Sequence, residues 1–400
     1  MQLLRPNPKS IRQLHSLIAE GIDLSTGRMT ARPDPFWKGL RDLGTELWLD
    51  TGDMEGARNV WTEEFSALTT NNTLLNDEVQ KGIYDDLIAR AAEVLSGVEE
   101  DRQVAEIAFV LNARHGLRLA QLFGGKVSVE LHTSQAHDTR GTIDYARRYH
   151  RVSRERFIVK VPLTPEGLMA TRKLRAEGIP INFTLGFSAR QNYLAARFAS
   201  PTYVNVFLGR LNSYISDNGL GDGKMAGEKA TLASQRAVRE VTGREPVRQI
   251  AASMRSSSQV ADLAGVDVFT MPLKVAADAR STLDGRWTSR RDADYPVSLA
   301  PGIDPSEVRL GVLWEVGEAE RRLADDLDAR PPRNSKELVS RVRRYGLKDL
   351  FPEMSSADLT RIAADGKIPR HEAWRSRIRR GEAAVDSLLN LAALASFKRS

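Results

Sequence analysis

Short apolar runs alternate with longer helical patterns along most of the chain. The eight runs are Leu47–Asp50, Ser66–Thr70, Val127–Leu131, Phe157–Val161, Ile181–Leu185, Tyr203–Leu208, Val247–Ser253 and Val266–Met271, and a helical pattern follows each. Strands that alternate with helices predict a parallel sheet with crossover helices. Eight such units match the ~250 residues of a (β/α)8 barrel. The predicted fold class is therefore α/β, a (β/α)8 TIM barrel.

An open, doubly wound sheet is the alternative fold. Its glycine-rich phosphate loop should follow the first strand, and Asp50-Thr51-Gly52-Asp53 is not such a loop. Between the second and third runs, helical stretches at 75–97 and 101–122 leave one helix more than a regular barrel requires. We keep the barrel as the prediction, with one extra helix at this point.

Three segments follow from the same pattern. Residues 1–45 are predicted to form an N-terminal helical segment, and residues 46–285 the barrel. Beyond about residue 286 the strand pattern stops, and Ala383–Phe397 is apolar enough to need covering. We expect 286–400 to be a C-terminal helical extension that packs on the barrel or on a partner subunit, the latter implying a homodimer.

Helix boundaries are marked by capping residues. Thr164 can cap the helix that follows the fourth run, with Pro165 at its first position. Ser355 and Asp358 have the spacing of a capping box, and Gly366 is a helix stop. These signals predict helices that start after Thr164 and after Ser355.

The run Phe157-Ile158-Val159-Lys160-Val161-Pro162 contains a lysine where a buried strand should be apolar. Burial of an ammonium group is costly and lowers a lysine pKa, and a neutral amine forms Schiff bases with carbonyl substrates. The alternative is an edge strand whose lysine reaches water along its apolar stem. The hexapeptide alone does not decide between the two.

Polar residues gather on one face near the ends of the runs. Residues i and i+2 of a strand point the same way. The opposite face, for example Val127, Val129 and Leu131, is apolar and should meet the helices. The other face is therefore predicted to line the barrel interior at its C-terminal end, where barrel enzymes have their active sites. Its members are Asp50, Thr69, Asn71, Ser128, Glu130, His132, Lys160, Asn182, Thr184, Asn205, Phe207, Ser253 and Arg255. This convergence favours a catalytic Lys160.

Composition narrows the function classes. A net charge of +6 suits small anionic substrates, and without a base-reading motif we expect no nucleic-acid partner. No cysteine is present, and the six histidines show no ligand spacing, so we expect no metal site. No apolar run approaches the ~20 residues of a membrane span, and Met1–Pro8 has no signal-peptide core. The expectation is a cytoplasmic protein without a membrane partner.

One further pattern is close to a catalytic motif. Gly186-Phe187-Ser188-Ala189-Arg190 nearly matches the nucleophile elbow of hydrolases, but Arg190 stands where the motif has its second glycine. We interpret it as a strand-to-helix turn with Ser188 as the cap.

The ordered set of motifs resembles the transaldolase family. Its segments are Leu47-Trp48-Leu49-Asp50-Thr51-Gly52-Asp53, Thr69-Thr70-Asn71, Val127-Ser128-Val129-Glu130, Ile158-Val159-Lys160, Asn182-Phe183-Thr184-Leu185-Gly186-Phe187-Ser188, Phe207-Leu208-Gly209-Arg210 and Ser253-Met254-Arg255. The resemblance spans about 47–285. It implies a class I barrel enzyme that moves a dihydroxyacetone unit between sugar phosphates in the pentose phosphate pathway, with no cofactor.

The resemblance also implies residue roles. Lys160 would be the Schiff-base lysine and Asp50 the general acid/base. Glu130 and Thr184 would place a water that carries protons. The substrate-binding residues would be Thr69, Asn71, Asn182, Asn205 and Phe207 around the sugar, and Arg210, Ser253 and Arg255 at the phosphate.

Glu130 and Phe207 stand where the related fructose-6-phosphate aldolases typically have Gln and Tyr, which favours transfer over cleavage. Asn205, His132 and Asn72 depart from the pattern of many transaldolases. An aldolase or an unusual-sugar transaldolase therefore stays open, as does a non-catalytic sugar-phosphate-binding protein.

Overall fold

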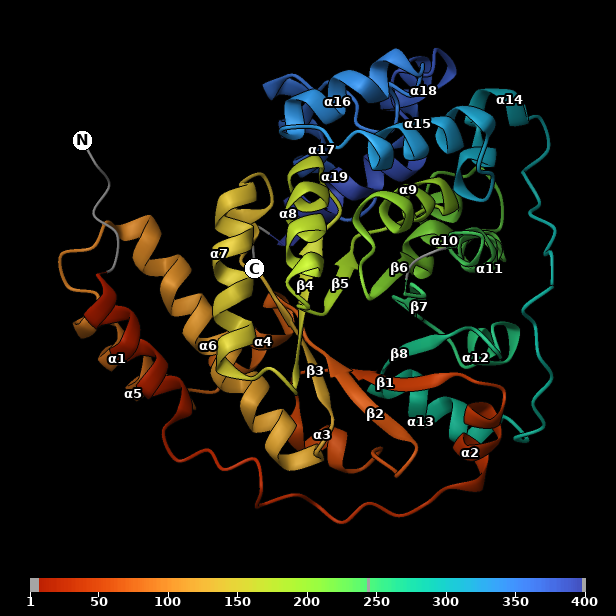
Figure 1. The fold of residues 1–400 in the computed structure, drawn as a ribbon. Helices are drawn as coiled ribbons and strands as arrows, with labels where there is room; N and C mark the ends of the chain where they lie inside the picture. The colour runs from red at the N-terminus through yellow and green to blue at the C-terminus, as the bar shows by residue number, and fades with distance from the viewer. Residues whose placement is uncertain (1–6, 243–244, 398–400) are drawn as a thin grey trace.

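Eight parallel strands form a closed barrel in the computed structural model, which describes residues 7–242 and 245–397 (Figure 1). The strands follow one another in chain order around the barrel, and β8 pairs with β1. They are β1 (Glu46–Asp50), β2 (Phe65–Thr69), β3 (Lys126–Glu130), β4 (Phe157–Pro162), β5 (Ile181–Thr184), β6 (Tyr203–Phe207), β7 (Arg248–Ala252) and β8 (Val268–Pro272). The predicted barrel is confirmed, and each strand begins and ends within two residues of its predicted position.

Helices follow every strand except β3, where a 3-10 turn (Thr133–Gln135) comes first. The barrel helices are α3 (Met54–Arg58), α4 (Asn72–Val79), α5 (Asp85–Val94), α6 (Glu100–Phe123), α7 (Thr139–Val152), α8 (Pro165–Ala176), α9 (Ala189–Ala199), α10 (Leu208–Asp217), α11 (Ala226–Arg239), α12 (Ser258–Asp262) and α13 (Leu273–Thr282). The insertion between β2 and β3 is present as predicted. It contains three helices, because the stretch 75–97 is divided between α4 and α5.

The predicted caps are present. Thr164 Oγ1 accepts a hydrogen bond from Gly167 N at 2.9 Å, and Pro165 is the first residue of α8. Ser355 and Asp358 form a reciprocal capping box at the start of α17 (Ser356–Asp365). Local sequence therefore fixes these helix starts.

The two faces of the strands separate as the alternation predicts. Val129 points outward onto α6, where Gly116 lies so close that a Cβ would come within 2.8 Å of Val129 Cγ1. Glu130 lies opposite Lys160 in the β3–β4 pairing, and Lys160 lies opposite Asn182 in the β4–β5 pairing. The register therefore sets these three polar side chains in one row on the inner face.

Helices precede and follow the barrel. Before it come α1 (Pro8–Ala19) and α2 (Pro35–Asp42), and after it come α14 (Pro305–Val308), a 3-10 turn (Leu310–Leu313), α15 (Glu318–Ala329), α16 (Ser335–Arg344), α17, α18 (His371–Arg379) and α19 (Val385–Phe397). Figure 1 shows the C-terminal helices, in blue, gathered beside α8 and α9. Buried side chains of α15, α16 and α19 belong to the same apolar core as the barrel, so the extension packs on its own barrel.

No helix in the described ranges is long and apolar enough to cross a membrane. Two predicted segments lie partly outside the described residues. They are Met1–Pro8, assessed above for a signal-peptide core, of which residues 1–6 are not described, and the predicted C-terminal extension, of which residues 398–400 are not described.

Candidate active site

A cavity of about 310 Å³ opens at the C-terminal ends of the strands. Ten of the twelve predicted site residues line it: Asp50, Thr69, Asn71, Lys160, Asn182, Asn205, Phe207, Arg210, Ser253 and Arg255. Glu130 and Thr184 are not in this lining, but both are buried on the strands beside it. The structure thus brings together side chains from seven strands and the loops that follow them.

Lys160 lies inside the barrel and is only 5% exposed. Its Nζ donates a hydrogen bond to Thr70 O at 3.2 Å and lies 3.5 Å from Glu130 Oε1. The alternative of an edge-strand lysine in water is therefore wrong. A primary amine with a carboxylate at ion-pair distance faces the cavity.

Asp50 ends β1 at the same cavity. Its Oδ1 accepts a 2.7 Å hydrogen bond from Thr69 Oγ1, which lies 2.6 Å from Thr270 Oγ1. Asp50 keeps part of its surface open to the cavity but is otherwise enclosed by the barrel. Burial raises its pKa above the ordinary value, although the positive charge of Lys160 and the Thr69 hydrogen bond act in the opposite direction. A carboxyl group with a raised pKa is suited to exchange protons with a substrate.

Glu130 and Thr184 lie on either side of Lys160 in the sheet. Glu130 Oε2 accepts a hydrogen bond from Asn72 N at 3.1 Å, which fixes the carboxylate next to the amine. The Thr184 hydroxyl is buried and has no hydrogen-bond partner among the described residues. A buried polar group of this kind is normally satisfied by water.

Amide side chains line the adjoining wall of the cavity. Asn182 Nδ2 donates to Ser128 Oγ at 3.1 Å, and Asn205 Nδ2 donates to Asn182 Oδ1 at 3.4 Å. Gly186 packs so tightly here that a Cβ would lie 2.3 Å from Asn205 O. Asn71 lines the cavity and also caps α4, where its Oδ1 accepts from Leu74 N at 2.9 Å. Close backbone packing thus holds Gly186 against Asn205.

Arg210 lies in the first turn of α10 and is buried, with Nη1 lacking a hydrogen-bond partner in the described part of the chain. Burial and the nearby charge of Arg255 lower the pKa of Arg210 to about 10, although Glu130 acts to raise it. Such an electropositive site near a helix N-terminus is suited to an anion.

Ser253 brings the two arginines together. It has a left-handed φ of +61°, and its carbonyl oxygen would lie 2.2 Å from a Cβ at Gly209. The glycine therefore allows the start of α10 to approach the turn after β7, where Arg255 follows. This close approach makes Arg210, Ser253 and Arg255 neighbours in one cavity.

A sequence model of the family described as Transaldolase/Fructose-6-phosphate aldolase matches residues 47–294. The chain belongs to this family. The matched stretch holds all twelve predicted site residues and all eight strands, apart from Glu46 at the start of β1.

Curated relatives agree with the family. A protein named Transaldolase from Xanthomonas euvesicatoria pv. vesicatoria is 32% identical over 285 residues, which cover 68% of this chain and 83% of the relative. Proteins of the same name from Methylococcus capsulatus and Nostoc punctiforme are 29% and 28% identical, over 64% and 72% of this chain and 82% and 88% of theirs. The shared name is that of a transferase, and the chain thus falls in a family of enzymes.

One predicted inward residue is placed elsewhere. His132 lies beyond the end of β3, where its Nδ1 is 2.8 Å from Ser134 Oγ in the 3-10 turn, and it does not line the cavity. The strand alternation fails here because the strand has already ended. Conversely, Thr270 lines the cavity, and alternation along the eighth run could have found it.

Three lining residues lie beyond the barrel strands and helices altogether. Lys367, Ser396 and Phe397 come from the C-terminal extension, outside the stretch that the family model matches. No group of three or more His, Cys, Asp or Glu within the described ranges is arranged to hold a metal ion.

Proposed function

We propose that the protein is a transaldolase that forms a Schiff base on Lys160. It would transfer a dihydroxyacetone unit from sedoheptulose 7-phosphate or fructose 6-phosphate to glyceraldehyde 3-phosphate or erythrose 4-phosphate, as a step of the pentose phosphate pathway. The observation that carries the proposal is the buried Lys160 amine, with Glu130 at 3.5 Å and Asp50 in the same cavity.

Schiff-base formation is the first step. Glu130 takes a proton from Lys160, and the free amine attacks C2 of the ketose. The resulting carbinolamine loses its C2 hydroxyl as water, with the proton delivered from Glu130 through a water held by Thr184. The unsatisfied Thr184 hydroxyl supports this relay. The product is a protonated imine, which can accept an electron pair.

Carbon–carbon cleavage follows. Asp50 takes the proton of the C4 hydroxyl, the C3–C4 bond breaks, and its electron pair moves into the imine to give an enamine. The aldose phosphate leaves. The enamine carbon then attacks the carbonyl carbon of the acceptor, Asp50 returns its proton to the new alkoxide, and hydrolysis frees Lys160. The raised pKa of Asp50 suits this exchange.

The remaining residues bind and orient the sugar. Asn71, Asn182 and Asn205 would contact the hydroxyls of the dihydroxyacetone unit, while Phe207 packs beside them. Arg210, Ser253 and Arg255 would hold the phosphate, and Thr69 positions Asp50 through its 2.7 Å hydrogen bond. The scheme needs no cofactor. We also propose that the chain is organised as an N-terminal helical segment (1–45), the barrel (46–285) and a C-terminal helical extension (286–400).

A second candidate is transfer of an unusual sugar, or simple aldol cleavage. It rests on Asn205, whose amide contacts Asn182 at 3.4 Å and would alter the donor end of the site. Free dihydroxyacetone formed from fructose 6-phosphate without an acceptor would favour cleavage.

The test is reduction with borohydride in the presence of fructose 6-phosphate. Mass spectrometry should find the reduced three-carbon adduct on Lys160 and none in Lys160→Met. Lys126→Met is the matched control, because Lys126 is exposed at the opposite end of β3, and it should trap as the parent protein does. An adduct on another lysine, or none, would contradict the proposal. Unchanged biological function of Lys160→Met would instead favour a non-catalytic binding protein.

A further inference from the structure

The last helix is fastened across the strand ends next to Lys160. Asn390 of α19 donates hydrogen bonds to Leu163 O at 3.0 Å and to Leu185 O at 2.9 Å, and these carbonyls directly follow β4 and β5. Asn390 is itself buried. One amide therefore ties α19 to the two strands that carry Lys160 and Asn182.

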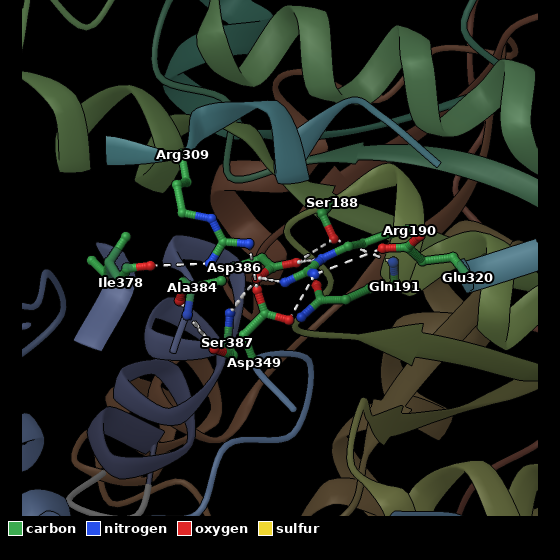
Figure 2. A network of polar contacts seen from close by, with 10 residues as sticks. All are labelled: Ser188, Arg190, Gln191, Arg309, Glu320, Asp349, Ile378, Ala384, Asp386 and Ser387. Carbon is green, nitrogen blue, oxygen red and sulfur yellow. Dashed lines mark hydrogen bonds and ion pairs between the residues drawn. The ribbon is translucent and has the colours of Figure 1, made fainter. Parts of the chain in front are cut away.

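A buried charge cluster makes a second attachment, shown in Figure 2. Asp386 of α19 accepts hydrogen bonds from Arg190 Nε at 2.8 Å, Arg190 Nη2 at 2.9 Å and Ser188 Oγ at 2.7 Å. Asp349 also accepts from Arg190, at 3.1 Å. Because Ser188 and Arg190 begin α9, these bonds hold the extension against the turn that follows β5.

The attachments carry the end of α19 to the cavity. Phe397 lies over Arg210, with the guanidinium carbon 5.5 Å from the ring centroid. Lys367 reaches the same cavity from the turn after α17, where Gly366 has a φ of +82°. The C-terminal extension thus forms one wall of the site.

The charge of this cavity is unbalanced. Four cationic side chains line it, Lys160, Arg210, Arg255 and Lys367, against two carboxylates, that of Asp50 in the lining and that of Glu130 beside Lys160. Arg210 Nη1 is buried without a hydrogen-bond partner among the described residues, whereas the side chain of Lys367 is exposed. The nearest acid in sequence, Asp365, is engaged with the backbone N–H and the guanidinium of Arg370.

We propose that Lys367 is a phosphate ligand of the substrate site, and that the C-terminal extension thereby contributes to the preference for phosphorylated sugars. This inference rests on the proposed function. A phosphate carries close to two negative charges, so it offsets the excess of cations and accepts hydrogen bonds from several of them. The side chain of Lys367 is exposed, so we expect it to add to substrate affinity rather than to folding.

The test is Lys367→Gln, with Lys336→Gln as the matched control. Lys336 is exposed on α16, in the same extension, but does not line the cavity. In Lys367→Gln the KM for fructose 6-phosphate should rise roughly 2- to 5-fold, the effect of one exposed ion pair, and by a larger factor than kcat falls. The rise should shrink at high ionic strength. Equal KM values in the two variants would overturn the proposal.

Dihydroxyacetone separates this inference from the proposed function. It lacks a phosphate, so borohydride should trap it on Lys160 equally in Lys367→Gln and in the parent protein. A parallel loss of both adducts would show that the variant has damaged the site as a whole, and would overturn the role of Lys367. If the parent protein traps neither sugar, the proposed function fails. In that case calorimetry with inorganic phosphate still tests the role of Lys367. The affinity for phosphate should weaken several-fold in Lys367→Gln and stay unchanged in Lys336→Gln.

Discussion

Asp386→Asn tests whether the buried cluster anchors the extension. Asp386 is fully buried and accepts four hydrogen bonds, two at each carboxylate oxygen: Ser188 Oγ and Arg190 Nε at Oδ2, and Arg190 Nη2 and Ser387 N at Oδ1. Asparagine keeps one oxygen. Whichever way its amide turns, a hydrogen bond from Arg190 is lost and an NH2 group faces a guanidinium donor.

The magnitude follows from this geometry. Hydrogen bonds to charged groups contribute ~1.5–3 kcal/mol, and breaking a buried ion pair typically costs ~3–5 kcal/mol. Burial acts to lower the pKa of Arg190, but Asp386 and Asp349 raise it above the ordinary value, so Arg190 stays charged. We therefore expect Asp386→Asn to reduce the free energy of unfolding by about 3 kcal/mol.

The control is Asp42→Asn. Asp42 pairs with Lys38 at 2.8 Å, the same distance as Asp386 with Arg190, but both side chains are more than 60% exposed. Its loss should be ~0.5 kcal/mol or less. Urea titrations followed by tryptophan fluorescence give both values, and hydrogen exchange should show α19 opening first in Asp386→Asn. A loss in Asp386→Asn below about 1 kcal/mol, or one equal to that of Asp42→Asn, would refute the reasoning.

Three further predictions concern the cavity. Asp50→Asn should lower kcat ~10²–10⁴-fold, because it removes the proposed acid/base. The same variant should stabilise the protein at pH values above the raised pKa of Asp50. Between the ordinary and the raised pKa, folded Asp50 retains a proton that the unfolded chain has lost, and above the raised pKa the folded state bears the full cost of ionising this carboxyl group. Urea titrations at low and neutral pH measure the gain in stability, and a larger gain in acid would contradict this prediction. Gly209→Ala places a Cβ 2.2 Å from Ser253 O, so it should raise the KM for phosphorylated sugars, with trapping of dihydroxyacetone as the comparison. Phe397→Ala removes the ring that lies over Arg210 and should let more water reach the enamine, so more free dihydroxyacetone should be released per transfer. An unchanged ratio of free dihydroxyacetone to transfer product would show that Phe397 does not shield the site.

Much of the site could be predicted from the sequence because side chains along a strand alternate between its two faces with a period of two residues. Once Lys160 is assigned to a buried strand, the same alternation places Glu130, Asn182 and Asn205 on the inner face, and the register confirms the row of Glu130, Lys160 and Asn182. His132 shows the limit of this reasoning, because the alternation holds only as far as the strand continues.

The turn at Ser188 and Arg190 shows what local sequence leaves undecided. The prediction that Ser188 caps α9 is confirmed, since its Oγ accepts from Gln191 N at 3.2 Å. Its second partner, Asp386, is 198 residues away in the chain, and nothing in the local pattern indicates it. Arg190, which breaks the resemblance to a hydrolase motif, is in fact the buried cation that fastens the extension.

The sequence by itself determined the barrel, the helix starts and the inward polar face, because each depends on periodicity or capping among near neighbours in the chain. Only the tertiary structure decided that the C-terminal extension forms one wall of the cavity and brings Lys367 and Phe397 to it. That arrangement rests on hydrogen bonds such as Asn390 to Leu163, 227 residues apart, and on burial of a charge cluster. Contacts of this kind are selected by the packing of the whole chain, so no short stretch of sequence contains them.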